Sequence, residues 1–356
     1  MAPLRGVCET LGVPRASRSD VAHRAGVAPT TVSNVLNGRA EVLRISPDTA
    51  QRVREAAHEL GYIPQASARA LRGGTSHTIG LLLAALPPTP YVPVVYDVLT
   101  AAMTRTQQRG HLTLPVAQPD SGTGTSYVDQ MMSDVDVAGV VCEYSQRNSE
   151  AGRRLCDLDV PVVWMSFSRP QELPPGVAHV YVDERPGVEE VLSQVDLPRG
   201  RRIVAVVGPV YRPERLVVAR RIFGRRLDII EADTWLPDSG AAATRQALED
   251  IPRLDAIFCT DDLLAIGAMR ALAEAKIAVP DDISVIGYGG YSITEGIEAG
   301  MTTVHWPLRD LTIAAIDALV DHVEGPAPLR QHKHAPVTRV IGTTAVIGRT
   351  ARLRSV

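Results

Sequence analysis

The sequence is poor in lysine and cysteine, and these shortages limit what the protein can be. Only two of its 37 cationic residues are lysines, which we attribute to genome composition. The four cysteines show no paired spacing, so neither a disulfide framework nor a zinc knuckle is predicted. Cys142 and Cys259 lie inside apolar runs, where cysteine behaves as a small buried hydrophobe.

Long apolar runs and enzyme signatures are also missing. No stretch approaches the ~18 residues of a membrane span, and the N-terminus lacks the apolar core of a signal peptide. The G-x-S-x-G, P-loop and H-E-x-x-H patterns do not occur. The sequence therefore predicts a cytoplasmic protein that is not an enzyme, with no cofactor, no metal and no membrane partner.

The length of the chain and the distribution of its charge indicate more than one domain. Its 356 residues suffice for two or three domains. The net charge is −3, yet residues 1–75 hold ten Arg against six Asp and Glu, a local balance of +4. A basic N-terminal segment on an acidic body indicates a local contact with nucleic acid or a membrane.

Periodicity separates four segments. Residues 1–17 have no pattern and are expected to be a flexible leader, residues 18–63 are helical, and residues 64–77 form a short Ala-rich linker. From 78 to 356, nine continuous apolar runs alternate with stretches of helical spacing. Apolar strands bounded by helices predict parallel sheets covered on both faces.

Nine strands exceed one comfortable sheet, so we expect two doubly wound α/β subdomains. The N-lobe is expected over about 78–175 and 306–335, and the C-lobe over about 176–305 and 336–356. Ligands of such sheets bind at the carboxyl ends of the strands, which places a ligand crevice between the two lobes.

The stretch DVAHRAGVAPTTVSNVLNG has the spacing of a helix-turn-helix. Ala22 is small where two helices would cross, and Gly26 suits the turn. Val32 and Val35 are apolar where the second helix must face the first, and Pro29 fits that helix's first turn. An ordinary helical hairpin without nucleic acid is the alternative.

A third helix follows with clear boundaries. Ser46 is a good N-cap, Pro47 a good first residue, and Gly61 a good C-cap. Its expected core stripe is Val53, Ala56, Ala57 and Leu60. Three small helices around one core predict a DNA-binding head.

These residues resemble the lactose/galactose-repressor (LacI/GalR) family of transcription regulators. The similarity is carried by DVAHRAGVAPTTVSNVLNG, by ISPDTAQRVREAAHELGYIPQASARALRGGTSHTIGLLL, and by FCTDDLLAIGAMRALAEAKIAVPDDISVIGY. The resemblance implies a small all-α helix-turn-helix head, a hinge helix, and an α/β body of two periplasmic-binding-protein-like subdomains. It also implies a homodimer on a double-stranded, pseudo-palindromic DNA operator, usually a repressor controlled allosterically by a small molecule.

The resemblance assigns DNA-contacting positions to the head and hinge. Base-reading slots fall on Pro29, Thr30 and Asn34, where family members commonly carry Arg at the last position. Leu71 matches a leucine that wedges into the minor groove. Candidate phosphate contacts, which fix register without reading sequence, are Arg24, Thr31, Ser33 and Asn37.

Effector positions carry over in the same way. Arg221 matches a ligand-gripping arginine, Trp235 an aromatic that stacks on the ligand, and Asp261 a polar cleft residue. Each also has a structural reading, as a surface ion-pair arginine, a packing tryptophan and a helix-capping aspartate. Tyr91 lies near the usual N-lobe contact loop.

Two effector positions depart from the family. Gly289 and Ser166 stand where the family usually has aspartates that contact sugar hydroxyls. This loss argues against an ordinary sugar effector. A transcriptional repressor remains the expected function; the alternatives are a solute-binding protein or an effector-independent regulator with a vestigial cleft.

Overall fold

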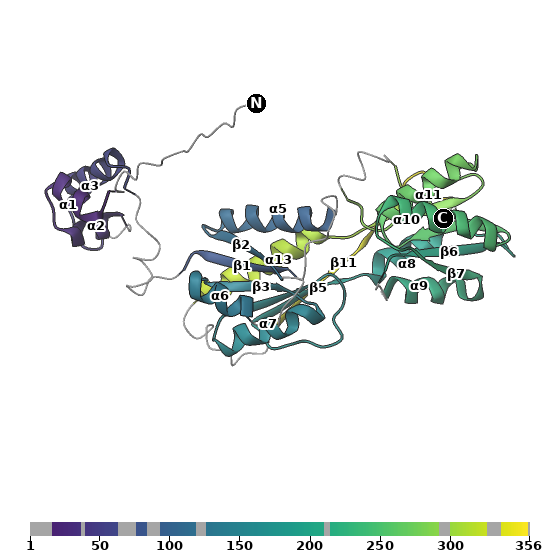
Figure 1. Cartoon of the computed structure of the whole chain (residues 1–356), viewed down its shortest axis with the longest axis horizontal. Coiled ribbons are helices and arrows are strands. Elements are labelled where there is room, and N and C mark those ends of the chain that lie inside the picture. Colours follow the sequence, from purple (N-terminus) through teal and green to yellow (C-terminus); the bar gives the residue numbers. More distant parts are fainter. Residues whose placement is uncertain are drawn as a thin grey trace, which may run out of the picture. The chain divides into compact units, whose positions relative to one another are not determined.

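The computed structural model divides into two compact units, Met1–Ser76 and His77–Val356. It describes eight stretches of the chain, which Figure 1 shows in colour. These are residues 16–36, 40–62, 76–83, 93–118, 126–209, 214–291, 300–325 and 336–354. None of the helices in these stretches has the length and apolar character needed to span a bilayer.

The first unit contains three short helices around one core. They are α1 (Arg18–Ala25), α2 (Pro29–Leu36) and α3 (Pro47–Glu59). The side chains of Val21, Ala22, Val32, Val35 and Val53 are buried together. Gly26 ends α1 in the left-handed conformation at φ 66°, as its place in the turn predicts.

The third helix has the predicted start but a different end. The Ser46 hydroxyl accepts a hydrogen bond from the Thr49 backbone N–H, and Pro47 opens the helix. Leu60 was expected in the core, but it is 36% exposed. It lies beyond the last helical turn, where the backbone turns away through Gly61 at φ 60°.

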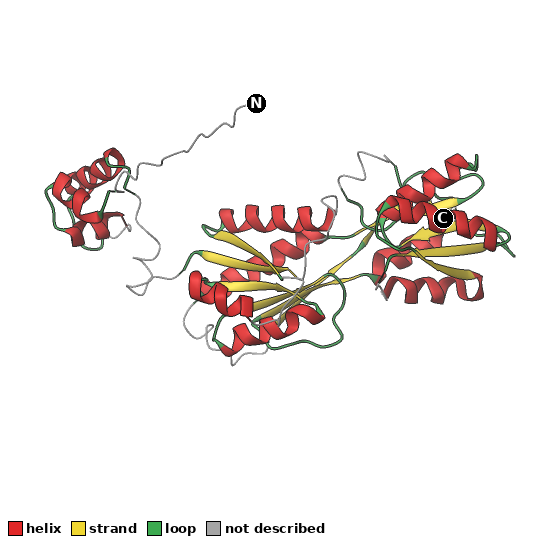
Figure 2. Ribbon diagram, in the orientation of Figure 1, coloured by secondary structure: helices red, strands yellow, loops and turns green. Residues whose placement is uncertain are grey.

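The second unit begins with a six-stranded parallel sheet in the order β11-β5-β4-β3-β1-β2. Its strands are β1 (Thr78–Leu83), β2 (Leu112–Ala117), β3 (Gly139–Glu143), β4 (Val162–Ser166), β5 (Ala178–Asp183) and β11 (Val337–Gly342). Helices α5 (Pro93–Gln108) and α13 (Leu308–Glu324) pack on one face, and α6 (Ser126–Asp134) and α7 (Gln146–Asp157) on the other (Figure 2). We call this part the first lobe.

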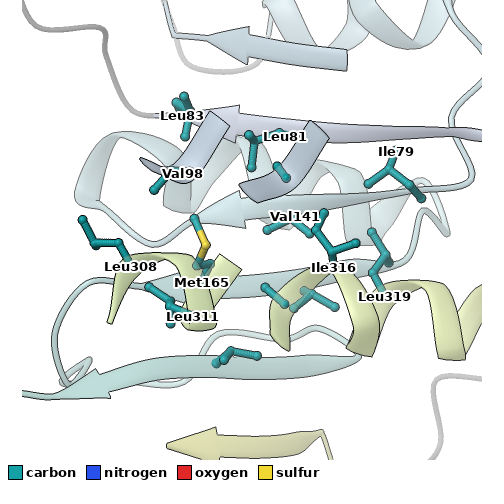
Figure 3. Close-up of a cluster of buried hydrophobic side chains, with 14 of the residues drawn as sticks. Ile79, Leu81, Leu83, Val98, Val141, Met165, Leu308, Leu311, Ile316 and Leu319 are labelled. Carbon is teal, nitrogen blue, oxygen red and sulfur yellow. The ribbon is translucent and has the colours of Figure 1, made fainter. Parts of the chain in front are cut away.

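The main core of the first lobe lies between its sheet and helix α13. Figure 3 shows Leu308, Leu311, Ile316 and Leu319 of α13 pointing toward the strands. Opposite them are the strand residues Ile79, Leu81, Val141 and Met165. Continuous burial of these strands on both faces is what their unbroken apolar runs predicted.

A second lobe holds a four-stranded parallel sheet in the order β7-β6-β8-β9. Its strands are β6 (Arg202–Val207), β7 (Leu227–Glu231), β8 (Leu254–Cys259) and β9 (Ser284–Ile286). Helices α8 (Arg185–Gln194) and α9 (Glu214–Phe223) pack on one face, and α10 (Pro237–Asp250) and α11 (Asp262–Glu274) on the other. The short turn η1 (Gly224–Arg226) follows α9, and β10 (Thr303–His305) pairs with β12 (Thr344–Val346).

All nine predicted apolar runs form strands, but the lobe boundaries need correction. Residues 178–183 and 337–342 fell within the expected C-lobe and were not among the nine predicted runs, whereas they form strands β5 and β11 in the sheet of the first lobe. The chain therefore passes between the lobes three times, after Asp183, between β10 and α13, and after Gly342. Strand β11 is an edge strand with mostly exposed residues, so it lacks the apolar run that reveals a buried strand.

Two glycines let α10 and α11 approach closely. A Cβ at Gly267 would lie 1.9 Å from the Pro237 carbonyl oxygen, and one at Gly240 would lie 2.3 Å from the Leu264 carbonyl oxygen. Both obstacles are backbone atoms, so the helices must separate to accept any side chain. The glycines thereby set the spacing of this helix pair.

We predict that Gly267→Ala destabilises the body by about 1–3 kcal/mol through overpacking. Urea unfolding followed by circular dichroism measures the loss. The control is Gly342→Ala, whose Cβ would meet Pro186 at an ordinary 3.6 Å. Equal effects at the two positions would contradict the close approach of α10 and α11.

Candidate functional site

The second helix of the head exposes a neutral polar face. Val32 and Val35 turn into the core, while Pro29 and Thr30 are exposed and Asn34 is half-buried. Thr30 and Asn34 are four residues apart, which puts them one above the other on the same face of α2. This face can present hydrogen-bonding groups without presenting charge.

Arg24, in the last turn of α1, forms an ion pair within the head. Its guanidinium contacts Glu59 of α3, with Nη2 2.8 Å and Nε 3.0 Å from Oε2. The arginine side chain is 62% exposed. Exposed pairs contribute only about 0–1 kcal/mol, so Arg24 can exchange Glu59 for another anion at little cost.

A set of charged and aromatic residues gathers in the body where the chain passes between the lobes. Each follows a strand or begins the next helix, and so lies at the carboxyl end of a sheet. We call this set the crossover cluster, and its members are Glu184, Arg215, Asp261, Asp262, Tyr288, Tyr291 and Trp306.

The centre of the crossover cluster is a buried ion pair. The side chains of Arg215 and Glu184 are only 3% and 1% exposed. Arg215 places Nη2 2.7 Å and Nε 3.1 Å from Glu184 Oε1, and it also donates to the Thr260 carbonyl. Its guanidinium lies 3.4 Å from the ring centroid of Tyr288, whose hydroxyl donates to Glu184. Burial raises the pKa of Glu184, and the charge of Arg215 opposes that rise.

Two consecutive carboxylates follow strand β8. Asp261 caps helix α11 by accepting from the Leu263 N–H at 2.8 Å, and its other oxygen accepts from the Tyr291 hydroxyl at 2.9 Å. Asp262 accepts from the Thr303 hydroxyl at 2.6 Å and the Gly290 N–H at 2.7 Å. Burial and the nearby charge of Asp262 raise the pKa of Asp261 to about 7.

The raised pKa of Asp261 predicts a pH-dependent stability. The folded state holds this proton more tightly than the unfolded chain, whose carboxyl has a pKa of 3.8. The contribution of Asp261 to stability is therefore complete below the unfolded pKa and is lost as the pH rises toward 7. Asp261→Asn keeps the acceptor for the Leu263 N–H but removes the titration.

We expect the difference in Tm between Asp261→Asn and wild type to grow in favour of the variant from pH 5 to pH 8. Thermal unfolding at several pH values measures it, with each pair of proteins in the same buffer. Comparing the variant with wild type cancels the contributions of other titrating groups. A difference that is constant across this range would contradict the raised pKa.

Trp306 connects the cluster to both lobes. Its ring packs against the cores of the first and the second lobe. Its Nε1 donates to the Phe167 carbonyl at 3.1 Å, and its ring meets Phe167 edge-on at 5.7 Å. Tyr288 lies 5.6 Å away on the second-lobe side. A change in the angle between the lobes would have to move this contact.

Models of known protein families match parts of both units. Residues 19–65 match the model for bacterial regulatory proteins of the lacI family, and residues 199–349 match a periplasmic binding protein-like domain. The ribose operon repressor of Escherichia coli K12 is 30% identical over 332 residues, covering 89% of this chain and 96% of that protein. The chain belongs to the lacI family.

Other regulators are also similar to this chain over most of its length. The HTH-type transcriptional regulator CelR of Thermobifida fusca is 29% identical over 315 residues, covering 86% of this chain and 91% of that protein. The crystal structure of the lac repressor dimer bound to operator and the anti-inducer ONPF matches with a TM-score of 0.76 at 22% identity, covering 94% of this chain and 98% of that one. The CelR–cellobiose complex matches with a TM-score of 0.62 at 26% identity, covering 95% and 100%. The predicted family and fold class are confirmed.

Arg221, the arginine that the family resemblance matched to the effector, has the surface ion pair of its alternative reading. Arg221 is 60% exposed and pairs with Glu189 of α8 at 2.8 Å, as a surface arginine does. Arg215, six residues earlier on the same helix, is instead the buried arginine and pairs with Glu184. Its signal in the sequence was its place in the first turn of the helix that follows strand β6.

Four of the other expected effector residues, Trp235, Ser166, Gly289 and Asp261, lie at or beyond the ends of strands. The ring of Trp235 is half-buried and lies against Gly208, where a Cβ would be 2.4 Å away. Ser166 ends β4, is buried, and donates its hydroxyl to the Ser168 carbonyl at 2.6 Å. Gly289 follows Tyr288 of the crossover cluster and has φ 143°. Asp261 caps α11, as its structural reading predicted, and its other oxygen accepts from the Tyr291 hydroxyl.

Some expectations fall outside the described residues. Asn37, Leu71 and Tyr91 belong to segments that the structure does not describe, as does most of the leader and the linker. Among the expected phosphate contacts, Thr31 and Ser33 are half-buried on α2.

Proposed function

We propose that this lacI-family protein is a sequence-specific DNA-binding transcriptional repressor. It would bind a pseudo-palindromic operator as a homodimer in the cytoplasm and respond to a small molecule held between its lobes. The observation that carries the proposal is the neutral polar face of α2 on a three-helix head, joined in one chain to a two-lobed body. The operator and the dimer are also named for the lac repressor, which this chain resembles in fold.

The base-reading side chains are Pro29, Thr30 and Asn34. Asn can bond the N6 and N7 atoms of adenine together, and Thr can meet a base edge or a thymine methyl in the major groove. Pro29 stands at the exposed start of the helix, where it contributes shape. Because Asn34 replaces an arginine common in the family, the operator should favour adenine where relatives read guanine.

Phosphate contacts and a minor-groove wedge complete the proposed DNA interface. Arg24 releases Glu59 to bind a phosphate, which supplies the charge that α2 lacks. Leu71 from each protomer unstacks a base step at the operator centre and kinks the duplex. The further phosphate contacts are Thr31, Ser33 and Asn37.

The proposed effector site is the crossover cluster. Arg215 takes the role first expected of Arg221, and Asp261 is its acidic neighbour at the end of β8. Trp235, Ser166, Gly289 and Tyr91 are the further residues proposed around the ligand. An effector acts by binding the two arrangements of the lobes with different affinity, typically by about 1–3 kcal/mol of coupling.

Neither an enzyme nor a solute-binding protein fits as well. The family consists of regulatory proteins. Asp261 and Asp262 are engaged in capping and in bonds to backbone and hydroxyl groups, and Glu184 is paired with Arg215, which is a structural use. A solute-binding protein of the same body fold would have no use for the head.

An electrophoretic mobility shift with DNA from upstream of the gene tests the proposal. The protein should shift a discrete fragment, and the affinity should fall steeply as salt increases, because binding releases counterions from phosphates. A truncated protein that begins at His77 serves as the control and should not shift the same fragment. The proposal fails if the full chain shows no salt-sensitive binding to any genomic fragment.

A further inference from the structure

Tyr291 reaches from the core of the first lobe to a carboxylate of the second. Its ring is buried in the apolar cluster that also contains Leu83, Val98 and Leu308. Its hydroxyl donates to Asp261 Oδ2 at 2.9 Å, and Asp261 follows strand β8 of the second lobe. One side chain therefore joins the two lobes at the place where the effector site is proposed.

Gly289 makes room for this ring. A Cβ at residue 289 would lie 2.5 Å from Cε2 and 2.8 Å from Cζ of Tyr291. The backbone there also has φ 143°, a conformation that side chains with a Cβ rarely adopt. A side chain at 289 and the ring of Tyr291 thus exclude each other. The ring of Tyr291 therefore occupies the space that the Cβ of an aspartate at position 289, usual in the family, would need.

The polar groups around Tyr291 are bonded within the chain. Asp261 receives the Leu263 N–H and the Tyr291 hydroxyl, and Arg215 contacts Glu184 and the Thr260 carbonyl. A ligand rich in hydroxyl groups would have to displace these partners to bond Asp261 or Arg215. Displacing them without replacement leaves buried polar groups unsatisfied, which is unfavourable.

We propose that the side chain of Tyr291 itself occupies the effector site. Its hydroxyl bonds Asp261 at the position where a hydroxyl group of a bound ligand would bond. This inference rests on the proposed function, which makes the crossover cluster the effector site. While the ring is in place, the site is closed to sugars such as the cellobiose and ribose bound to related regulators. The molecule that fits once the ring is removed is a para-substituted phenol, which has the shape and single hydroxyl of the side chain.

Complementation with p-cresol, the isolated tyrosine side chain, tests this proposal in the full-length protein. Tyr291→Ala should unfold at a lower temperature than wild type because it leaves a cavity between buried apolar groups. Added p-cresol should raise the Tm of the variant progressively with concentration, as a ligand of the folded state does. Toluene should raise it less, because it cannot bond Asp261.

Tyr291→Phe is the matched control, because it keeps the ring and removes only the hydroxyl. Neither Tyr291→Phe nor wild type should gain Tm from p-cresol, cellobiose or ribose. The proposal is overturned if wild type is stabilised by either sugar, or if p-cresol stabilises wild type as much as Tyr291→Ala. It is also overturned if folded Tyr291→Ala shows no response to p-cresol.

A second variant covers the case in which Tyr291→Ala does not fold. Tyr291→Val keeps apolar packing on the first lobe and opens only the space next to Asp261, and phenol is then the probe. Stabilisation of this variant by phenol, with none in wild type, supports the proposal, and no stabilisation contradicts it. These readouts need no DNA, so a failure of operator binding would leave them unchanged and would refute only the proposed function.

Discussion

Replacing Arg215 with methionine should lower the free energy of unfolding of the body by about 3–5 kcal/mol. The side chains of Arg215 and Glu184 are almost fully buried, so removing the arginine leaves a carboxylate without its counter-charge. The variant would also lose the stacking of the guanidinium on Tyr288. Urea unfolding of the purified protein, followed by circular dichroism, measures the loss.

Arg221→Met supplies the matched control, because it removes an arginine from the same helix. Arg221 pairs with Glu189 at the surface, so its loss should cost no more than about 1 kcal/mol. Adding Glu184→Gln to Arg215→Met should recover most of the stability, since the second change removes the unpaired charge. If both single variants lose the same stability, the assignment of Arg215 as the central buried cation is wrong.

Replacing Asn34 with alanine should weaken binding to the specific operator by roughly 5- to 150-fold, the equivalent of about 1–3 kcal/mol. Its amide can bond one adenine at two positions, and alanine offers neither bond. Binding to unrelated DNA at low salt should change little, because that binding depends on phosphate contacts. Fluorescence anisotropy with operator and scrambled duplexes separates the two effects.

Arg24→Gln is the matched control in the head. This change should weaken specific and non-specific binding alike and reduce the salt slope by about one, as expected for a phosphate contact. Circular dichroism confirms that both variants keep the helical head. If Asn34→Ala weakens operator and scrambled DNA equally, Asn34 does not read a base.

The sequence predicted the head well because its signals are local. A glycine in the turn, a serine before Pro47 and valines at helical spacing act over a few residues, and the structure has Gly26, Ser46, Val32 and Val35 in those roles. Leu60 was expected in the core but is exposed, because it follows the last turn of α3, where the backbone turns away from the core. Strands β5 and β11 were both missed; β11 is an exposed edge strand that carries no apolar run, and in β5 the polar His179 interrupts the run.

The crossover cluster was harder to predict, because its residues come from distant parts of the chain. Arg221 and Arg215 share a helix and a motif, and only the fold decides which of them is buried beside Glu184. The loss of an aspartate at Gly289 was visible in the sequence. That Tyr291 occupies the adjoining space depends on a contact within the folded loop.

Selection of binding sites from a random DNA library tests the central claim most directly. The full-length protein should enrich one sequence made of two inverted half-sites, as expected for a dimer whose α2 helices enter successive major grooves. Asn34→Ala should lose preference at a single base pair, the same one in each half-site. Enrichment of no sequence, or of a consensus that Asn34→Ala leaves unchanged, would contradict the account of α2 as the helix that reads DNA.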